Sequence, residues 1–146
     1  MDWITVKVKT EAGVTLPAYE TTEAAGMDVC AYLKQDVIIQ PLGRALIPTG
    51  IRMEIPRGHE CQVRPRSGLA LNHGITVLNT PGTIDADSRA EIGIVLINLS
   101  DKAFTVRNGD RICQLVFKKC ERARWEKVSE LDRTRREDGS FGKSGL

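Results

Sequence analysis

Residues 79–91 read NTPGTIDADSRAE, residues 92–98 continue as IGIVLIN, and this stretch decides the fold. The first part is a turn sequence that carries acids. The second part is an apolar run rich in β-branched residues, which is typical of a buried strand. Entry through Pro81-Gly82 would hold the carboxylate of Asp85 rigidly at the foot of a hairpin. A carboxylate held in this way is well placed for chemistry that needs a rigid group.

Short predicted strands lie on both sides of this stretch and are separated by turn residues. One short helix is expected, capped by Ser67 and ended by Gly74. Almost no other helical periodicity is present, so the pattern predicts an all-β fold, a β-sandwich or a jelly roll. The expected strands cover residues 4–9, 25–31, 36–39, two strands within 45–55, 60–64, 75–78, 91–99, 103–106, 111–117 and 125–128.

The length of 146 residues fits one domain with a sizeable core. The net charge of +2 gives no bulk attraction for nucleic acid, and no apolar run approaches the roughly 20 residues that span a bilayer. The first residues lack the pattern of a signal peptide. None of the four cysteines forms a Cys-x-x-Cys pair, so we expect reduced, buried thiols. Together these features predict a cytoplasmic protein without nucleic-acid or membrane partners.

Residues 132–146 differ from the rest in composition, because they are charged, then punctuated by glycines, with Phe141 as the one aromatic residue. We expect a domain over residues 1–131 and a flexible arm over residues 132–146. The cations and the ring would let this arm close over an anionic, planar ligand, and a disordered terminus is the alternative. Residues 142–144 look like part of a P-loop, but no strand precedes them and no helix can follow.

Several polar residues are candidates for chemistry. Arg66-Ser67-Gly68 at the expected helix start offers backbone N–H groups, a guanidinium and a hydroxyl to a phosphate, and a capped helix with a solvated arginine is the alternative. Asp28 and Asp85 lie beside apolar residues, where an unpaired carboxylate is costly, so we expect a partner such as hydrated Mg²⁺ or a catalytic water. Gln114 interrupts an apolar run, and its amide would bond either within the core or to substrate or water.

Five short motifs, in order along nearly the whole chain, resemble those of the trimeric deoxyuridine triphosphate diphosphatases (dUTPases). One such motif would be a weak signal, but five in register make coincidence an inadequate explanation. The motifs are AGMDVCA at 25–31, PRSGLA at 65–70, GTIDADSRAE at 82–91, GDRICQL at 109–115, and the tail from Arg136.

The resemblance implies a jelly-roll homotrimer whose three active sites are each built from all three subunits. The implied reaction is hydrolysis of dUTP to dUMP and pyrophosphate, with Mg²⁺ as a cofactor on the triphosphate. Asp85 would orient and deprotonate the water that attacks the α-phosphorus, and Gln114 would help to hold substrate or water. Asp28 would act on the metal through water.

The resemblance also implies a set of substrate-binding residues. Phe141 would stack over uracil, and Arg136 with the tail glycines would clamp the phosphates. The hairpin could reject cytosine strongly, because cytosine reverses the hydrogen-bonding pattern of uracil. The implied binding residues are Arg66, Ser67 and Gly68 for phosphate oxygens, Asn79, Thr83, Ile84, Ser88 and Gly93 around the base and sugar, and Arg136, Phe141 and Gly142 in the arm.

The chain departs from the family pattern at the sugar position and in the arm. Ser88 stands where the family has a tyrosine that packs on the deoxyribose, and Ala90 stands where it has glycine. Because serine cannot cover that face, we expect weaker dUTP binding and relaxed discrimination against UTP. In the arm, Glu137, Ser140 and Lys143 replace glycine, glycine and serine, which narrows the range of φ angles.

Two other functions compete with this interpretation. The related dCTP deaminases share the fold, but their proton-transferring glutamate would fall at Val95, where this chain has no acid. A trimeric nucleotide-binding or regulatory module with little turnover is favoured by the departure at Ser88. The presence of Asp85, Gln114 and Arg66 argues against that module.

Overall fold

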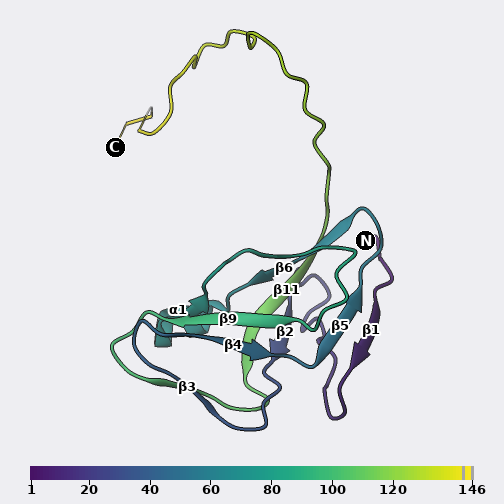
Figure 1. Cartoon of the computed structure of the whole chain (residues 1–146), viewed down its shortest axis with the longest axis vertical. Coiled ribbons are helices and arrows are strands. Elements are labelled where there is room, and N and C mark those ends of the chain that lie inside the picture. The colour runs from purple at the N-terminus through teal and green to yellow at the C-terminus, as the bar shows by residue number, and fades with distance from the viewer. Residues whose placement is uncertain (143, 146) are drawn as a thin grey trace.

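The computed structural model describes residues 1–142, 144 and 145, and it consists mainly of short β-strands with one short helix (Figure 1). The all-β class predicted from the sequence is therefore confirmed. The elements in chain order are β1 (Lys7–Thr10), β2 (Met27–Cys30), β3 (Val37–Ile39), β4 (Arg44–Pro48), β5 (Ile51–Glu54), β6 (His59–Arg64), α1 (Ser67–His73), β7 (Ile75–Val77), β8 (Gly82–Ile84), β9 (Gly93–Asn98), β10 (Phe104–Val106) and β11 (Arg111–Lys119).

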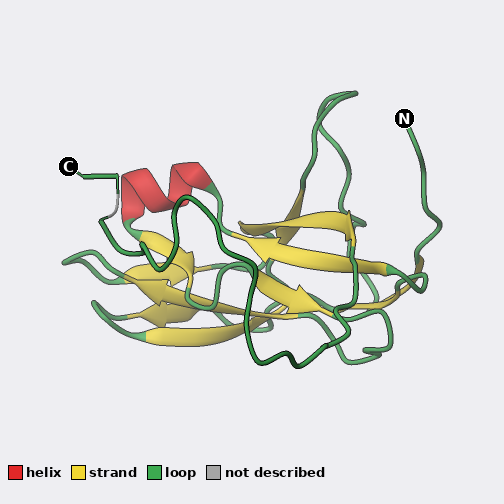
Figure 2. Cartoon of the chain, turned by 90° about the horizontal axis from the view of Figure 1, so that it is seen from above, coloured by secondary structure: helices red, strands yellow, loops and turns green. Residues whose placement is uncertain are grey.

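The strands form two larger sheets and two strand pairs, and every pairing is antiparallel. One sheet has the order β2-β11-β6-β8 and the other has the order β4-β9-β7, while β1 pairs with β5 and β10 pairs with β3. Neighbouring strands in these sheets are mostly distant in sequence, so long crossing connections build the fold. Figure 2 shows the strands gathered into a flattened body with α1 at one end.

The strand β9 shows how the apolar run builds the core. Its side chains alternate, so that Ile94, Leu96 and Asn98 are buried while the residues between them are partly exposed. The Asn98 amide is satisfied because its Nδ2 donates to the carbonyl oxygens of Ile39 at 2.9 Å and Lys102 at 2.7 Å. These bonds fix the end of β9 against β3 and against the turn that follows β9.

The structure corrects two expectations about strands. The stretch at 82–84 was expected to be part of a turn, but it is the strand β8, because Gly82 and Ile84 pair with Val63 and Cys61 of β6. Three residues are too few to show a strand period in the sequence. The strand expected at 125–128 does not form, and Trp125 is 93% exposed. Without a neighbouring strand, this segment has no ladder of hydrogen bonds to hold it.

The helix also begins differently from the prediction. Ser67 is the first helical residue rather than the cap, and Arg66 is the N-cap residue without a side-chain capping bond. Gly74 ends the helix as expected, because its positive φ of 64° allows its N–H to reach the carbonyls of Ala70 and Leu69.

After β11 the chain leaves the body as an extended segment without regular secondary structure in its described residues (Figure 1). This segment begins where β11 ends, at Lys119, and it includes the predicted arm of residues 132–146. The domain boundary between residues 131 and 132 stays a prediction. Its closure over a site stays a prediction.

Candidate functional site

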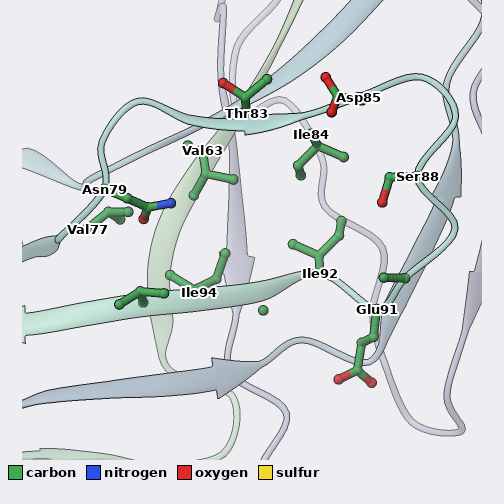
Figure 3. A pocket seen from close by; sticks show the side chains of 14 residues that line it. Val63, Val77, Asn79, Thr83, Ile84, Asp85, Ser88, Glu91, Ile92 and Ile94 are labelled. Atoms are coloured by element: carbon green, nitrogen blue, oxygen red, sulfur yellow. The ribbon is translucent and has the colours of Figure 1, made fainter.

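A pocket of about 220 Å³ lies between β8, the loop that follows it, and β9 (Figure 3). It contains every residue predicted to surround a base and sugar, because β8 and β9 lie on either side of the same loop. Its size suits one small ring rather than a whole nucleotide, since pockets for larger ligands begin near 300 Å³. The lining residues are Val63, Val77, Asn79, Gly82, Thr83, Ile84, Asp85, Ser88, Ala90, Glu91, Ile92, Gly93, Ile94 and Val95.

The pocket has apolar walls and a polar end. Ile84 and Ile92 point into it, while the amide of Asn79 enters from the side (Figure 3). Gly82 lets β8 pass close to β6, because a Cβ at this position would lie 3.2 Å from Cβ of Val63 and 3.5 Å from Nδ2 of Asn79. Apolar walls with a few polar groups at one edge fit a flat heterocycle whose edge forms hydrogen bonds.

The side chain of Asp85 points away from these apolar walls. Along β8 and just beyond it, Thr83 and Asp85 lie on the outer face while Ile84 lies on the inner face (Figure 3). Asp85 is exposed, which corrects the expectation of a carboxylate among apolar neighbours. Strand alternation explains the difference, because adjacent residues point to opposite faces. Ser88 is half-buried and its hydroxyl group is directed toward the pocket.

A second cluster of predicted site residues lies on β2, β11 and the start of α1. The carboxylate of Asp28 is flanked by two guanidinium groups, with Oδ1 3.4 Å from Nε of Arg66 and Oδ2 3.7 Å from Nη1 of Arg111. Nη1 of Arg66 donates to the carbonyl oxygen of Arg111 at 3.2 Å. Asp28 therefore orients two cations, and the water-mediated metal role proposed for it stays a prediction.

Gln114 belongs to the same cluster, because it lies opposite Asp28 in the pairing of β11 with β2. Its side chain is half-buried and packs tightly, since a Cβ on Gly26 would lie 2.6 Å from its Oε1. Ser67 and Gly68 lie next to this cluster in the first turn of α1, and both are exposed. Their backbone N–H groups are among those that no helical carbonyl satisfies.

Within one chain, the pocket that Asp85 borders and the cluster around Asp28 and Gln114 lie apart. Ile84 lies opposite Cys61 and Gln114 lies opposite Arg64, so the Asp85 end of β8 and Gln114 are three positions apart along β6 and on opposite sides of it. That corresponds to roughly 10 Å along the sheet and roughly 10 Å across it. Within a single chain the predicted base and Gln114 cannot contact the same small ligand atom.

The predicted arm residues form a third group that lies away from both. Nε of Arg136 donates to the carbonyl oxygen of Gly139 at 2.8 Å, so this guanidinium is engaged within the arm. Glu137 has a φ of 50°, in the left-handed region, which is unfavourable for a residue other than glycine. The ring of Phe141 is fully exposed, and Lys143 lies outside the described residues.

None of the four cysteines, which all lie in the described part of the chain, forms a disulfide, but the prediction that all four are buried is wrong for two of them. Cys61 and Cys113 are buried, Cys120 is half-buried and Cys30 is exposed. Burial raises the pKa of the Cys61 thiol and of the Cys113 thiol to about 12. These two thiols therefore behave as small core residues.

Among residues 1–142, 144 and 145, no group of three or more His, Cys, Asp or Glu side chains is arranged to hold a metal ion. In that same part of the chain, no helix has both the length and the apolar character needed to cross a membrane.

The chain matches known proteins along nearly its whole length. The family model described as dUTPase matches residues 12–145. The chain belongs to the dUTPase family. The deoxyuridine 5'-triphosphate nucleotidohydrolase of Syntrophotalea carbinolica is 53% identical over 147 residues, and the match covers 100% of this chain and 100% of that relative. That of Cytophaga hutchinsonii is 51% identical over 140 residues, which is 96% of this chain and 91% of the relative.

Solved dUTPase structures support the fold. A variant of the dUTPase from Staphylococcus bacteriophage 80alpha, solved with dUpNHpp, superposes with a TM-score of 0.87 at 23% identity. The match covers 97% of this chain and 99% of the phage chain. The dUTPase family predicted from five sequence motifs is thereby confirmed, together with the β-rich fold.

Motif reading missed residues that the structure brings to the site of this dUTPase family member. Val63 on β6, Val77 on β7 and Ile92 just before β9 form pocket walls, and only the pairing of these strands brings them together. Arg111 was inside a recognised motif, but its contact with Asp28 depends on the β2–β11 register. No pattern local to the sequence signals either set.

Proposed function

We propose that this chain hydrolyses dUTP to dUMP and pyrophosphate by attack of water on the α-phosphorus. Membership of the dUTPase family supports the reaction, and its relatives are named as dUTP nucleotidohydrolases. The observation that carries the assignment of the site is the pocket between β8 and β9, an apolar slot with Asn79 at one edge and with Asp85 at its rim, where the carboxylate is turned outward.

The geometry separates base recognition from chemistry. A uracil ring between Ile84 and Ile92 would place its polar edge near Asn79, and the sugar would leave the pocket past Ser88. The phosphates would then lie along the outer face of β8, toward which the carboxylate of Asp85 is directed. Asp85 takes a proton from water as the water oxygen bonds to the α-phosphorus. The bond from the α-phosphorus to its bridging oxygen breaks, and pyrophosphate leaves.

The second cluster supplies the charge that this reaction needs. Arg66, held by Asp28, and the exposed N–H groups of Ser67 and Gly68 are suited to phosphate oxygens. Gln114 would hold substrate or the attacking water. Because Asp85 and Gln114 do not meet within one chain, we propose that the complete site forms between copies of the chain in a homotrimer with a jelly-roll subunit.

An exposed apolar face supports assembly into such an oligomer. On the outer side of the β4-β9-β7 sheet, Leu46 lies opposite Val95 and is 68% exposed. Gly93 lies on this side as well, because a Cβ there would meet Leu46 at 2.8 Å. An exposed leucine beside a partly exposed valine on one sheet face is suited to burial against another copy of the chain.

The residues present fit Mg²⁺ only as an ion that keeps most of its waters. Asp28 is a single carboxylate already engaged by two guanidinium groups, and no larger acidic cluster occurs among the described residues. Mg²⁺ commonly retains several waters and takes its other ligands from substrate phosphates. When bound, the ion would offset charge on the triphosphate. Asp28 would orient its waters while keeping Arg66 in place.

The arm would complete the site on binding. Phe141 has no partner in the body, so its ring is free to stack on uracil, while Arg136 and Gly142 would close over the phosphates. We further propose that residues 1–131 fold as the domain, that residues 132–146 act as this arm, and that the protein works in the cytoplasm without nucleic-acid or membrane partners.

The test of the reaction is hydrolysis in ¹⁸O-labelled water with and without Mg²⁺. Attack on the α-phosphorus places the label in dUMP, whereas label in pyrophosphate would contradict the mechanism. Ammonia release from dCTP would favour a deaminase. Tight nucleotide binding without pyrophosphate release would favour a regulatory module instead.

Mixing two inactive variants tests the shared site. Asp85→Asn removes the base and Arg66→Ala removes the phosphate contact. If subunits share sites, refolding the two variants together restores part of the activity, because some sites combine an intact Asp85 with an intact Arg66. If activity does not return while oligomers form, each site lies within one chain.

A further inference from the structure

The loop of residues 85–91, between β8 and β9, carries pocket residues but is anchored mainly at its ends. Its start is fixed by the pairing of Ile84 with Cys61. Just beyond its end, the N–H of Ile92 donates to the carbonyl oxygen of Ile51 at 2.8 Å, and Oγ1 of Thr49 donates to the carbonyl oxygen of Ile92 at 2.7 Å. The middle of the loop, which sets the directions of Asp85 and Ser88, needs its own support.

Arg89 supplies that support from within the loop. Its Nη1 donates to the carbonyl oxygen of Ala86 at 2.7 Å and to that of Ser88 at 3.0 Å. Nη1 therefore ties two backbone groups of the loop together and leaves Nη2 of the same planar group free for another partner, an arrangement on two nitrogens that a lysine ammonium cannot reproduce. The N–H of Ser88 adds a bond to the carbonyl oxygen of Asp85 at 3.1 Å.

The strand β5 holds Arg89 in turn. Nη2 of Arg89 lies 3.3 Å from Oε1 of Glu54, and Nη1 of Arg52 donates to the carbonyl oxygen of Arg89 at 3.0 Å. The other carboxylate oxygen of Glu54 lies 3.1 Å from Nζ of Lys7, its partner across the β1–β5 pair. Glu54 thus has one cation on each oxygen, and only one of the two belongs to the loop.

We infer that Arg89 is a positioning residue, which places Asp85 and Ser88 by bridging the loop carbonyls and is itself anchored to β5 by Glu54 and Arg52. The inference rests on the proposed function, because it assigns Arg89 a role in that reaction. A plain surface ion pair would act differently: such pairs contribute little to stability and tolerate exchange of arginine for lysine. Holding the two loop carbonyls with Nη1 and Glu54 with Nη2 at the same time requires the guanidinium fork.

The deciding variant is Arg89→Lys in the full chain, compared with Arg89→Met, Glu54→Gln and Lys7→Met. We expect both Arg89 variants to lower kcat about 10- to 100-fold, because small misplacements of reacting groups have effects of this size. KM should change less, and the melting temperature should stay close to that of the unaltered protein. Glu54→Gln should have a smaller effect, and Lys7→Met almost none.

Arg107→Met is the matched control. Arg107 is also exposed and forms an ion pair, with its Nε 3.8 Å from Oδ2 of Asp36, but it lies outside the pocket and its loop. This variant should keep kcat and KM within about twofold, since an exposed pair contributes little. A fall in kcat equal to that of Arg89→Lys would overturn the inference.

Amide hydrogen exchange separates this inference from the proposed function. Arg89→Lys should speed exchange at residues 86–90 and leave β6 and β11 unchanged, whether or not the chain hydrolyses dUTP. If the unaltered protein does not hydrolyse dUTP but Arg89→Lys still exchanges faster at residues 86–90, the proposed function is contradicted while the bridging role of Arg89 in the loop is supported. Unchanged exchange together with unchanged kcat in Arg89→Lys would overturn the positioning role. Should Arg89→Met fail to fold, Glu54→Gln and Arg52→Met decide by the same two measurements.

Discussion

The pocket between β8 and β9 and the arm of residues 132–146 are held in opposite ways. Pocket residues lie on paired strands or on a loop anchored by Ile92 and Arg89. The side-chain hydrogen bonds of the described arm residues run to neighbours three positions away, as from Arg136 to Gly139. One part of the proposed site is therefore formed before substrate arrives. The other part must be ordered by substrate, and that ordering reduces the net binding energy.

This contrast predicts two kinds of mutant. Changes in the formed part should act on the chemical step, because the base and the loop are already in place. Changes in the arm should act mainly on substrate binding, because its contacts exist only in the complex. The variants below begin with the largest expected effect.

Asp85→Asn should lower kcat about 100- to 10,000-fold, the range expected when a general base is lost. KM should stay close to that of the unaltered protein, because the pocket walls are untouched. Steady-state pyrophosphate release measures both constants. Asp87→Asn is the control, since Asp87 is an exposed acid on the same loop. Equal losses of kcat in the two variants would show that the negative charge of the loop is what matters, and would contradict the role of Asp85 as a general base.

Phe141→Ala should raise KM about tenfold or more with little change in kcat, because stacking on a base is worth about 1–3 kcal/mol. Leu131→Ala removes another exposed apolar side chain of the extended segment and should have little effect. Isothermal titration with a non-hydrolysable dUTP analogue checks the binding directly. A loss of kcat without a change in affinity would mean that the ring belongs to the chemical step.

Ser88→Tyr should raise the preference for dUTP over UTP about tenfold, as expected when a side chain fills space beside a substrate group. The measured quantity is the ratio of kcat/KM for the two nucleotides. Ser88→Ala should leave that ratio near its original value, because serine covers no more of the sugar face than alanine. An unchanged ratio in Ser88→Tyr would show that another side chain already excludes the 2′-hydroxyl group.

Glu137→Gly should lower KM roughly threefold, because glycine adopts the left-handed conformation without the steric cost of a side chain. Asp138→Gly removes the same charge at a neighbouring position that has no positive φ. The difference in KM between the two variants separates the effect of backbone strain from the effect of charge repulsion. Equal gains in both would assign the effect to charge.

Sequence patterns located the strongest features of this molecule and missed those that depend on strand pairing. The run that became β9 was recognisable because it is a continuous apolar stretch rich in β-branched residues. The strand β8 was missed, because its three residues become a strand only by pairing with β6. The expected strand at 125–128 had a suitable composition but no neighbouring strand.

The site shows the same contrast between residues that a local sequence pattern reveals and contacts that depend on strand pairing. The predicted base and sugar residues all come from the continuous stretch 79–98, and the structure brings them together because β8 and β9 flank one loop. The outward direction of Asp85 was not foreseen, since it depends on the phase of a short strand. The contacts of Arg89 with Glu54 and of Asp28 with Arg111 join residues far apart in sequence, so no local pattern could show them.

The uneven exposure of the cysteines has a practical consequence. Cys61 and Cys113 react poorly with thiol reagents, because burial raises the pKa of both thiols to about 12. Cys30 is exposed and lies across from Arg111. Once Cys120→Ser removes the half-buried competitor, a maleimide dye would attach selectively at Cys30. Such a dye would sit two residues from Asp28 and could report the arrival of a triphosphate in real time, without altering the pocket walls.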